Sequence, residues 1–100
     1  MIVVRFKVKC RAEKTEEAMA AFQEVVRASR AVDGVASFDI GHDVVDRDAC
    51  VAVEVFEGRA ALDRQEALPA TQKAISLLGE LVAAEPEATI YHVSSSEPWG

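Results

Sequence analysis

Hydrophobic and polar residues alternate strictly along the first stretch of the chain, from Ile2 to Cys10. One face would carry Ile2, Val4, Phe6, Val8 and Cys10, and the opposite face Val3, Arg5, Lys7 and Lys9. A period of two residues is typical of a half-buried β-strand. We therefore predict a strand over residues 2–10, whose basic face meets water or acidic partners because an unpaired charge is costly to bury.

The stretch from Gly34 to Phe56 predicts two further strands joined by a polar turn at residues 46–48. In the first of them, one face includes Phe38, Ile40 and His42. In the second, alternation separates two sets, namely Val51, Val53 and Val55 against Cys50, Ala52, Glu54 and Phe56. We predict that the three valines point toward the helices. Glu54 would then lie on the opposite face, within cross-strand reach of Arg5 or Lys7 as an ion-pair partner.

The segments between the strands carry apolar residues at helical spacing. Residues 14–32 predict one long amphipathic helix that ends at Asp33 and Gly34, where glycine suits a left-handed backbone. Residues 59–83 predict a second helical region, in which Pro69 imposes a break near Leu68 between a short helix and a longer one. Residues 88–94 predict a last strand.

The order of these elements, β-α-β-β-α-β, predicts an α+β protein with a ferredoxin-like fold. Four antiparallel strands would form one sheet, with the first and third strands at its centre and the helices on one face. Residues 1–94 would form this domain, and residues 95–100 a C-terminal tail that includes Trp99.

Composition limits the partners and the location. Half of the 100 residues are hydrophobic, which favours one folded domain over a disordered chain. The formal net charge of −6 gives no electrostatic reason to bind nucleic acid or an anionic membrane. No apolar run approaches the ~18 residues of a membrane span, and the first ten residues lack a signal-peptide pattern. We therefore expect a cytoplasmic protein.

Cys10 and Cys50 are the only cysteines, and they show neither CxxC spacing nor a neighbouring histidine cluster. This pattern argues against a structural metal site. We expect both to be free thiols that act as small hydrophobic residues within strands, with a disulfide as the less favoured alternative.

Four stretches of the sequence are together similar to one known family, namely IVVRFKVK, TEEAMAAFQEVVRASR, DGVASFDIGHDVVDRDACVAVEVFEGRAALDRQ and ALPATQKAISLL. With them the chain resembles, over nearly all of residues 1–93, the antibiotic-biosynthesis monooxygenase (ABM) domain family of the dimeric α/β-barrel superfamily. The resemblance implies a homodimer, in which two ferredoxin-like protomers join through their sheet faces into a barrel. It also implies a pocket between sheet and helices in each protomer. Members include cofactor-free oxygenases of quinols and aromatic polyketides, and haem-degrading enzymes.

The haem-degrading relatives use an Asn on the first strand, and a Trp and a His in the second helical region. The corresponding positions here hold Val4, Gln65 and Ile75. None of these can ligate haem iron as His does, so we expect neither haem nor any other cofactor.

The resemblance implies a cofactor-independent monooxygenase of small aromatic or quinol-type substrates, which needs a base, a dry pocket and orientation. His42 and His92 are the candidate bases, because histidine titrates near neutral pH, although for each the favoured alternative is a structural residue at the end of its strand. Gln65, Tyr91 and Phe38 are the candidate substrate-binding residues. The alternative is a non-catalytic protein that binds a small ligand or serves as a scaffold on the same dimeric fold.

Overall fold

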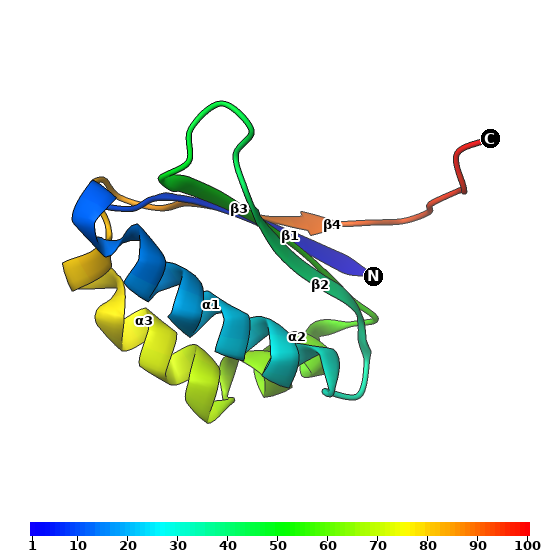
Figure 1. The fold of residues 1–100 in the computed structure, drawn as a ribbon. Coiled ribbons are helices and arrows are strands. Elements are labelled where there is room, and N and C mark those ends of the chain that lie inside the picture. The colour runs from blue at the N-terminus through cyan, green and yellow to red at the C-terminus, as the bar shows by residue number, and fades with distance from the viewer.

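The computed structural model describes all 100 residues and consists of one four-stranded antiparallel sheet covered by helices on one face (Figure 1). The strands are β1 (Ile2–Lys9), β2 (Val35–His42), β3 (Ala49–Phe56) and β4 (Glu87–His92). The helices are α1 (Thr15–Arg30), α2 (Arg59–Glu66) and α3 (Pro69–Leu81), and a short 3-10 helix, η1 (Ala12–Lys14), precedes α1. The strand order β2-β3-β1-β4 confirms the predicted ferredoxin-like arrangement, with β1 and β3 at the centre.

The helices begin and end where local chemistry requires it. In α1 the positions buried against the sheet recur at helical spacing, and they are Thr15, Ala18, Phe22, Val25 and Ser29. The predicted break at Pro69 is confirmed, because α2 ends at Glu66 and Pro69 is the first residue of α3. Leu68 between them is extended, as expected for a residue that precedes proline.

The register between β1 and β3 corrects the predicted orientation of the third strand. Val4 lies opposite Glu54, and Phe6 lies opposite Ala52. Directly opposed residues share a face, so the side of β3 that contains Glu54 points toward the helices together with Val4 and Phe6. The prediction that Val51, Val53 and Val55 face the helices was wrong. Alternation alone does not fix the face, because a shift of one residue in register turns every side chain over.

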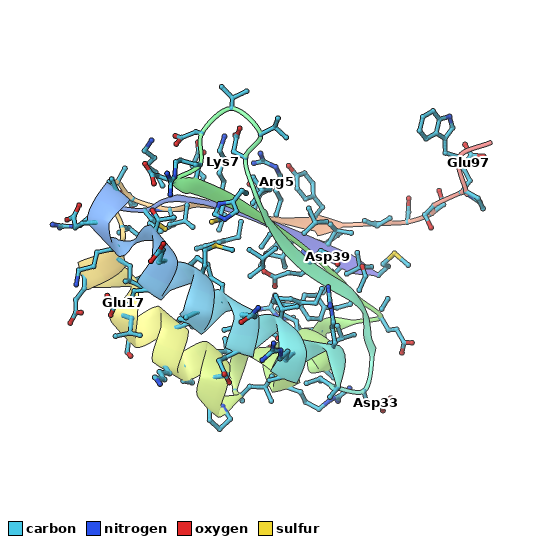
Figure 2. The ribbon with its side chains drawn as sticks, in the orientation of Figure 1. Arg5, Lys7, Glu17, Asp33, Asp39 and Glu97 are labelled. Atoms are coloured by element: carbon cyan, nitrogen blue, oxygen red, sulfur yellow. The ribbon has the colours of Figure 1, made fainter.

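The prediction that Glu54 forms an ion pair with Arg5 or Lys7 was also wrong, because the register places Glu54 on the opposite face of the sheet. Lys7 pairs with Asp43 at 3.3 Å and Lys9 pairs with Asp46, so the loop after β2 supplies the acidic partners instead of Glu54. Arg5 lies opposite Val53. Figure 2 shows Arg5 and Lys7 on the side of the sheet that faces away from the helices.

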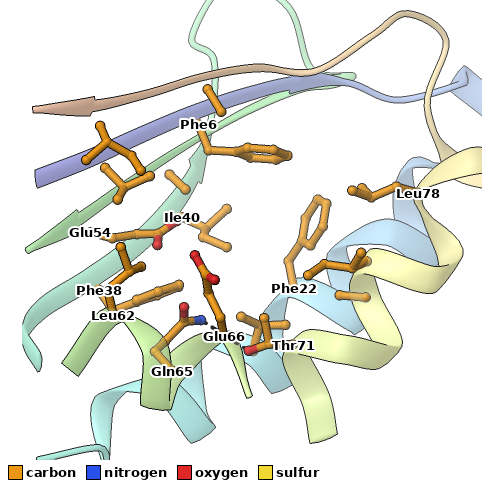
Figure 3. Close-up of a pocket in the computed structure, with 17 residues that line it drawn as sticks. Phe6, Phe22, Phe38, Ile40, Glu54, Leu62, Gln65, Glu66, Thr71 and Leu78 are labelled. Atoms are coloured by element: carbon orange, nitrogen blue, oxygen red, sulfur yellow. Dashed lines mark hydrogen bonds between the residues drawn. The ribbon is translucent and has the colours of Figure 1, made fainter. Parts of the chain in front are cut away.

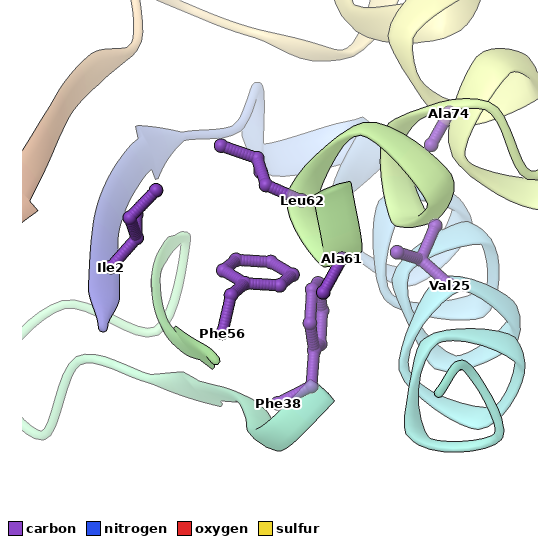
Figure 4. Packing of buried hydrophobic residues seen from close by; sticks show 7 residues of the cluster. All are labelled: Ile2, Val25, Phe38, Phe56, Ala61, Leu62 and Ala74. Atoms are coloured by element: carbon purple, nitrogen blue, oxygen red, sulfur yellow. The ribbon is translucent and has the colours of Figure 1, made fainter. Parts of the chain in front are cut away.

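Two groups of buried side chains join the sheet to the helices. The first, drawn in Figure 4, is Ile2, Val25, Phe38, Phe56, Ala61, Leu62 and Ala74. The second is Val8, Cys10, Ala18, Phe22, Cys50 and Leu81. Both cysteines are buried and free, as the sequence predicted, and burial is the main reason that the pKa of each thiol is raised, that of Cys50 to about 11.

The face of the sheet that no helix covers is mixed, with an apolar row along β3 beside basic residues of β1. It carries the three valines of β3 with Val3, Arg5 and Lys7 of β1 beside them, and Thr89 and Tyr91 of β4 next to β1. Val53 is 43% exposed and Tyr91 is 49% exposed. No helix of the chain combines the length and the apolar character needed to cross a membrane.

Candidate active site

A cavity of about 280 Å³ lies between the sheet and the helices. Of the 17 residues that line it, 13 are hydrophobic, and the four others are Glu54, Gln65, Glu66 and Thr71 (Figure 3). Four lining residues are exposed, namely Glu66 at the end of α2, Ile75 on α3 at 52%, and Ala88 and Ile90 on β4, the last at 42%. The cavity therefore opens to solvent between α3 and the edge strand β4.

The sheet leaves room for this cavity because Ala52 lies at its centre. Ala52 is opposed by Phe6 on β1 and by Ile40 on β2, and all three line the cavity. A methyl side chain between two large ones leaves a hollow that the helices do not fill. The alternation of β3 therefore sets both the small residue and the acid that follows it, Glu54, on the cavity side.

Glu54 is the only ionisable residue of the sheet that lines the cavity. Its neighbours on the adjoining strands are Val4 and Phe38, and it forms no ion pair. Burial, and to a smaller extent the charge of Glu66, raises the pKa of Glu54 to about 7. Figure 3 shows the two carboxyl groups turned toward each other. Glu54 can therefore accept or release a proton near neutral pH.

Gln65 is held by the helices on either side of it. Its amide nitrogen donates to Ser29 Oγ at 3.0 Å and to Thr71 Oγ1 at 3.1 Å. Gln65 belongs to α2, Ser29 to α1 and Thr71 to α3, so one buried amide joins all three helices at the cavity wall. Such fixed polar groups can orient a ligand, because their own partners hold them in place.

The structure brings two of the five predicted site residues into the cavity. Phe38 and Gln65 line it, and both are buried. His42 lies opposite Cys50 and His92 lies opposite Ile2, at the ends of their strands, where both are exposed and neither lines the cavity. Tyr91 lies opposite Val3 on the uncovered face.

Sequence reasoning missed Glu54 as a cavity residue and treated it as a surface ion-pair partner. One signal was present, since Glu54 is the only charged residue in the strand ACVAVEVF. A lone acid in the central strand of a sheet with one covered face has two possible environments, and only the register decides between them. No group of three or more His, Cys, Asp or Glu side chains lies close enough together to hold a metal ion.

Comparison with known sequences gives two matches. The sequence profile of the family described as antibiotic biosynthesis monooxygenase matches residues 1–77. The uncharacterized protein sll1783 of Synechocystis is 28% identical over 96 residues, which cover 96% of this chain. The match covers 65% of that protein, so the chain is shorter than this relative.

Solved structures share the fold over almost the whole chain. Rv0793 from Mycobacterium tuberculosis has a TM-score of 0.88 at 21% identity, covering 97% of this chain and 98% of that chain. Protein SO0527 from Shewanella oneidensis has a TM-score of 0.84 at 25% identity, covering 92% and 89%. A crystal structure described as an antibiotic biosynthesis monooxygenase has a TM-score of 0.86 at 19% identity, covering 95% and 100%.

Proposed function

Because this chain belongs to the antibiotic biosynthesis monooxygenase family, we propose that it is a monooxygenase that acts on a small aromatic substrate of the quinol type. The observation that carries the proposal is an apolar cavity of about 280 Å³ into which Glu54 points. A mostly apolar cavity with a few convergent polar groups is the usual form of a site for a small organic ligand.

In this proposal Glu54 is the base that removes a phenolic proton from the substrate. With a pKa of about 7, a large share of Glu54 is ionised at neutral pH, and its conjugate acid can return the proton. Gln65 would accept a hydrogen bond from a ring hydroxyl through Oε1, since its amide nitrogen already donates to Ser29 and Thr71, and Phe38 would pack against the ring. The base is therefore assigned to Glu54 in place of His42 or His92, since Glu54 alone of the three lines the cavity.

The reaction balances with dioxygen as the only oxidant. The phenolate gives one electron to dioxygen, and the resulting superoxide joins the aryl radical at a ring carbon to form a hydroperoxide. Loss of the ring C–H proton with cleavage of the O–O bond releases water and leaves a hydroxyquinone. One oxygen atom of dioxygen enters the ring and the other leaves as water. The quinol supplies all four electrons, so no further reductant takes part.

We also propose that the protein is a homodimer joined through the uncovered sheet face. The support is the apolar row of β3 on that face, where Val53 is 43% exposed between Val51 and Val55. Large exposed apolar patches favour contact with another protein surface, and two-fold pairing of like patches is the commonest form of association.

Oxygen uptake tests the catalytic proposal. Wild type should consume oxygen with at least one member of a hydroquinone panel, and one ¹⁸O atom from labelled dioxygen should appear in the product. Glu54→Gln should lower the rate by about 100-fold, the lower end of general-base contributions. Glu80→Gln, on the exposed end of α3, should retain the rate, as should His42→Ala and His92→Ala.

Two outcomes contradict this mechanism. A Glu54→Gln variant that retains the wild-type rate would remove Glu54 as the base, and a loss confined to a histidine variant would move that role to the histidine. No uptake with any quinol would favour the second candidate, a non-catalytic protein that binds a small ligand. The observation that favours this second candidate is the exposure of both histidines outside the cavity.

A further inference from the structure

All the formal charge around the cavity is negative. Glu54 and Glu66 are the only charged residues among the 17 that line it, and no Lys, Arg or His lines it. Neither glutamate takes part in any ion pair of the protein. A low-dielectric cavity that concentrates one sign of charge attracts ligands of the opposite sign and repels ligands of the same sign.

The two acids come from opposite walls of the cavity. Glu54 lies on β3 between Val4 and Phe38, which leaves it no polar partner on the neighbouring strands. Glu66 is the last residue of α2, directly after the buried Gln65. Their carboxyl groups are turned toward each other across the cavity (Figure 3). Glu66 is exposed at the mouth of the cavity, and its charge repels that of Glu54, so a cation between the two carboxylates is favoured.

We propose that the cavity selects small arylalkyl amines, with the ammonium group held between the carboxylates of Glu54 and Glu66 and the ring packed against the apolar lining. This inference rests on the proposed function for the location of the site and extends it to the class of ligand. For the oxidation, it indicates a quinol with an aminomethyl group next to one hydroxyl, so that Glu54 can reach both groups, over a phenolic acid. A carboxylate on the ring would lie against two like charges without a basic side chain to receive it.

The affinity for an amine should depend on pH through Glu54. The cavity residues contributed by α1, β1, β2, α3 and β4 include no titratable group, so Glu66 is the only one that faces Glu54. The pKa of Glu54, raised to about 7 by burial and by Glu66, places the gain of negative charge between pH 6 and pH 8. Affinity for an amine that stays protonated over this range should therefore rise with pH.

Calorimetric titration under nitrogen, with three probes of similar size, tests the inference without any turnover. Benzylamine should bind at pH 8 at least about tenfold more tightly than benzyl alcohol, a difference of about 1.4 kcal/mol, and benzoate should bind most weakly. Benzylamine should also bind more tightly at pH 8 than at pH 6, whereas benzyl alcohol should not change.

Variants separate the roles of the two acids and locate the site. Glu54→Gln should reduce the affinity for benzylamine to that for benzyl alcohol, and Glu80→Gln should leave it unchanged. Glu66→Gln should move the pH at which affinity rises to a lower value, because the second carboxylate no longer raises the pKa of Glu54. Ala52→Leu should abolish binding of all three probes by filling the cavity. Circular dichroism checks that each variant is folded.

Benzoate binding as tight as that of benzylamine, or benzylamine binding that survives Glu54→Gln or Ala52→Leu, would overturn the inference. These results are independent of oxygen chemistry. Amine binding without oxygen uptake would refute the monooxygenase proposal alone, and quinol oxidation without amine preference would refute this inference alone.

Discussion

Glu54 is a carboxylic acid in the middle of a sheet, with Val4 and Phe38 as its neighbours on the adjoining strands. Burial favours its neutral form, so between the ordinary pKa near 4.5 and the raised value of about 7 the folded protein holds a proton that the unfolded chain has lost. Raising the pH through this window therefore lowers the free energy of unfolding. Above pH 7 the free energy of unfolding is lowered by the full amount, and below pH 4.5 it is not lowered.

Glu54→Gln should remove this fall in the free energy of unfolding with rising pH. We expect the free energy of unfolding of the variant, relative to wild type, to rise by roughly 2–3 kcal/mol between pH 4.5 and pH 8, since each pKa unit corresponds to about 1.36 kcal/mol. Urea unfolding at a series of pH values measures the difference. Glu80→Gln, an exposed control, should differ from wild type by the same amount at every pH. A pH-independent difference for Glu54→Gln would mean that Glu54 ionises as it does in the unfolded chain.

At the scale of elements, Gly34 sets the path from α1 into β2. It has a φ of +87°, and a Cβ placed on it would lie 2.8 Å from the Cβ of Ala61 on α2. Gly79 in α3 has open space around it instead. The same substitution should therefore have opposite effects at the two positions.

Gly34→Ala should destabilise the protein by about 1–3 kcal/mol, because alanine is strained at positive φ and also contacts α2 too closely. Gly79→Ala should stabilise it by about 0.5–1 kcal/mol, because alanine restricts the unfolded chain and favours the helix. Thermal or urea unfolding of both variants measures whether each substitution lowers or raises the free energy of unfolding. Equal changes in stability at the two positions would show that the positive φ of Gly34 does not make alanine unfavourable there.

Most elements could be predicted from the sequence because their signals are local. Pro69 fixed the start of α3 and Gly34 the turn before β2, and both lie where the sequence placed them. The orientation of β3 could not be predicted, because Val51, Val53 and Val55 alternate with Ala52 and Phe56 and either set suits a buried face. The orientation of β3 is set by its pairing with β1, which is distant in sequence, and the same pairing places Glu54 on the side of the helices.

The candidate site was predicted in the same uneven way. Phe38 and Gln65 line the cavity. Phe38 was chosen as an apolar residue in the middle of a strand, and Gln65 from its position in the family resemblance, and both choices depend on the fold alone. The histidines were chosen for their chemistry, and the ends of β2 and β4 place both in solvent.

At the scale of the whole molecule, the uncovered face of the sheet predicts the assembly. Val53→Asp should convert a dimer into a monomer, because a charged side chain would replace an apolar one in the proposed interface. The fold should persist, since Arg5 lies directly opposite position 53 and can pair with the new acid. Analytical ultracentrifugation measures the mass, and circular dichroism checks the fold.

Val44→Asp is the matched control, because Val44 is 101% exposed in the loop between β2 and β3 and should leave the mass unchanged. A wild-type protein that sediments as a single chain at high concentration would contradict the proposed homodimer.

Gln65 joins α1, α2 and α3 through two directional hydrogen bonds beside the cavity. No one of these helices can tilt outward alone without leaving a buried polar group unpaired, which costs about 1–3 kcal/mol. The cavity should therefore be rigid. A ligand enlarged by a second fused ring should bind more weakly, although its greater hydrophobicity favours transfer out of water. Ligand size should then limit affinity more than ligand hydrophobicity does.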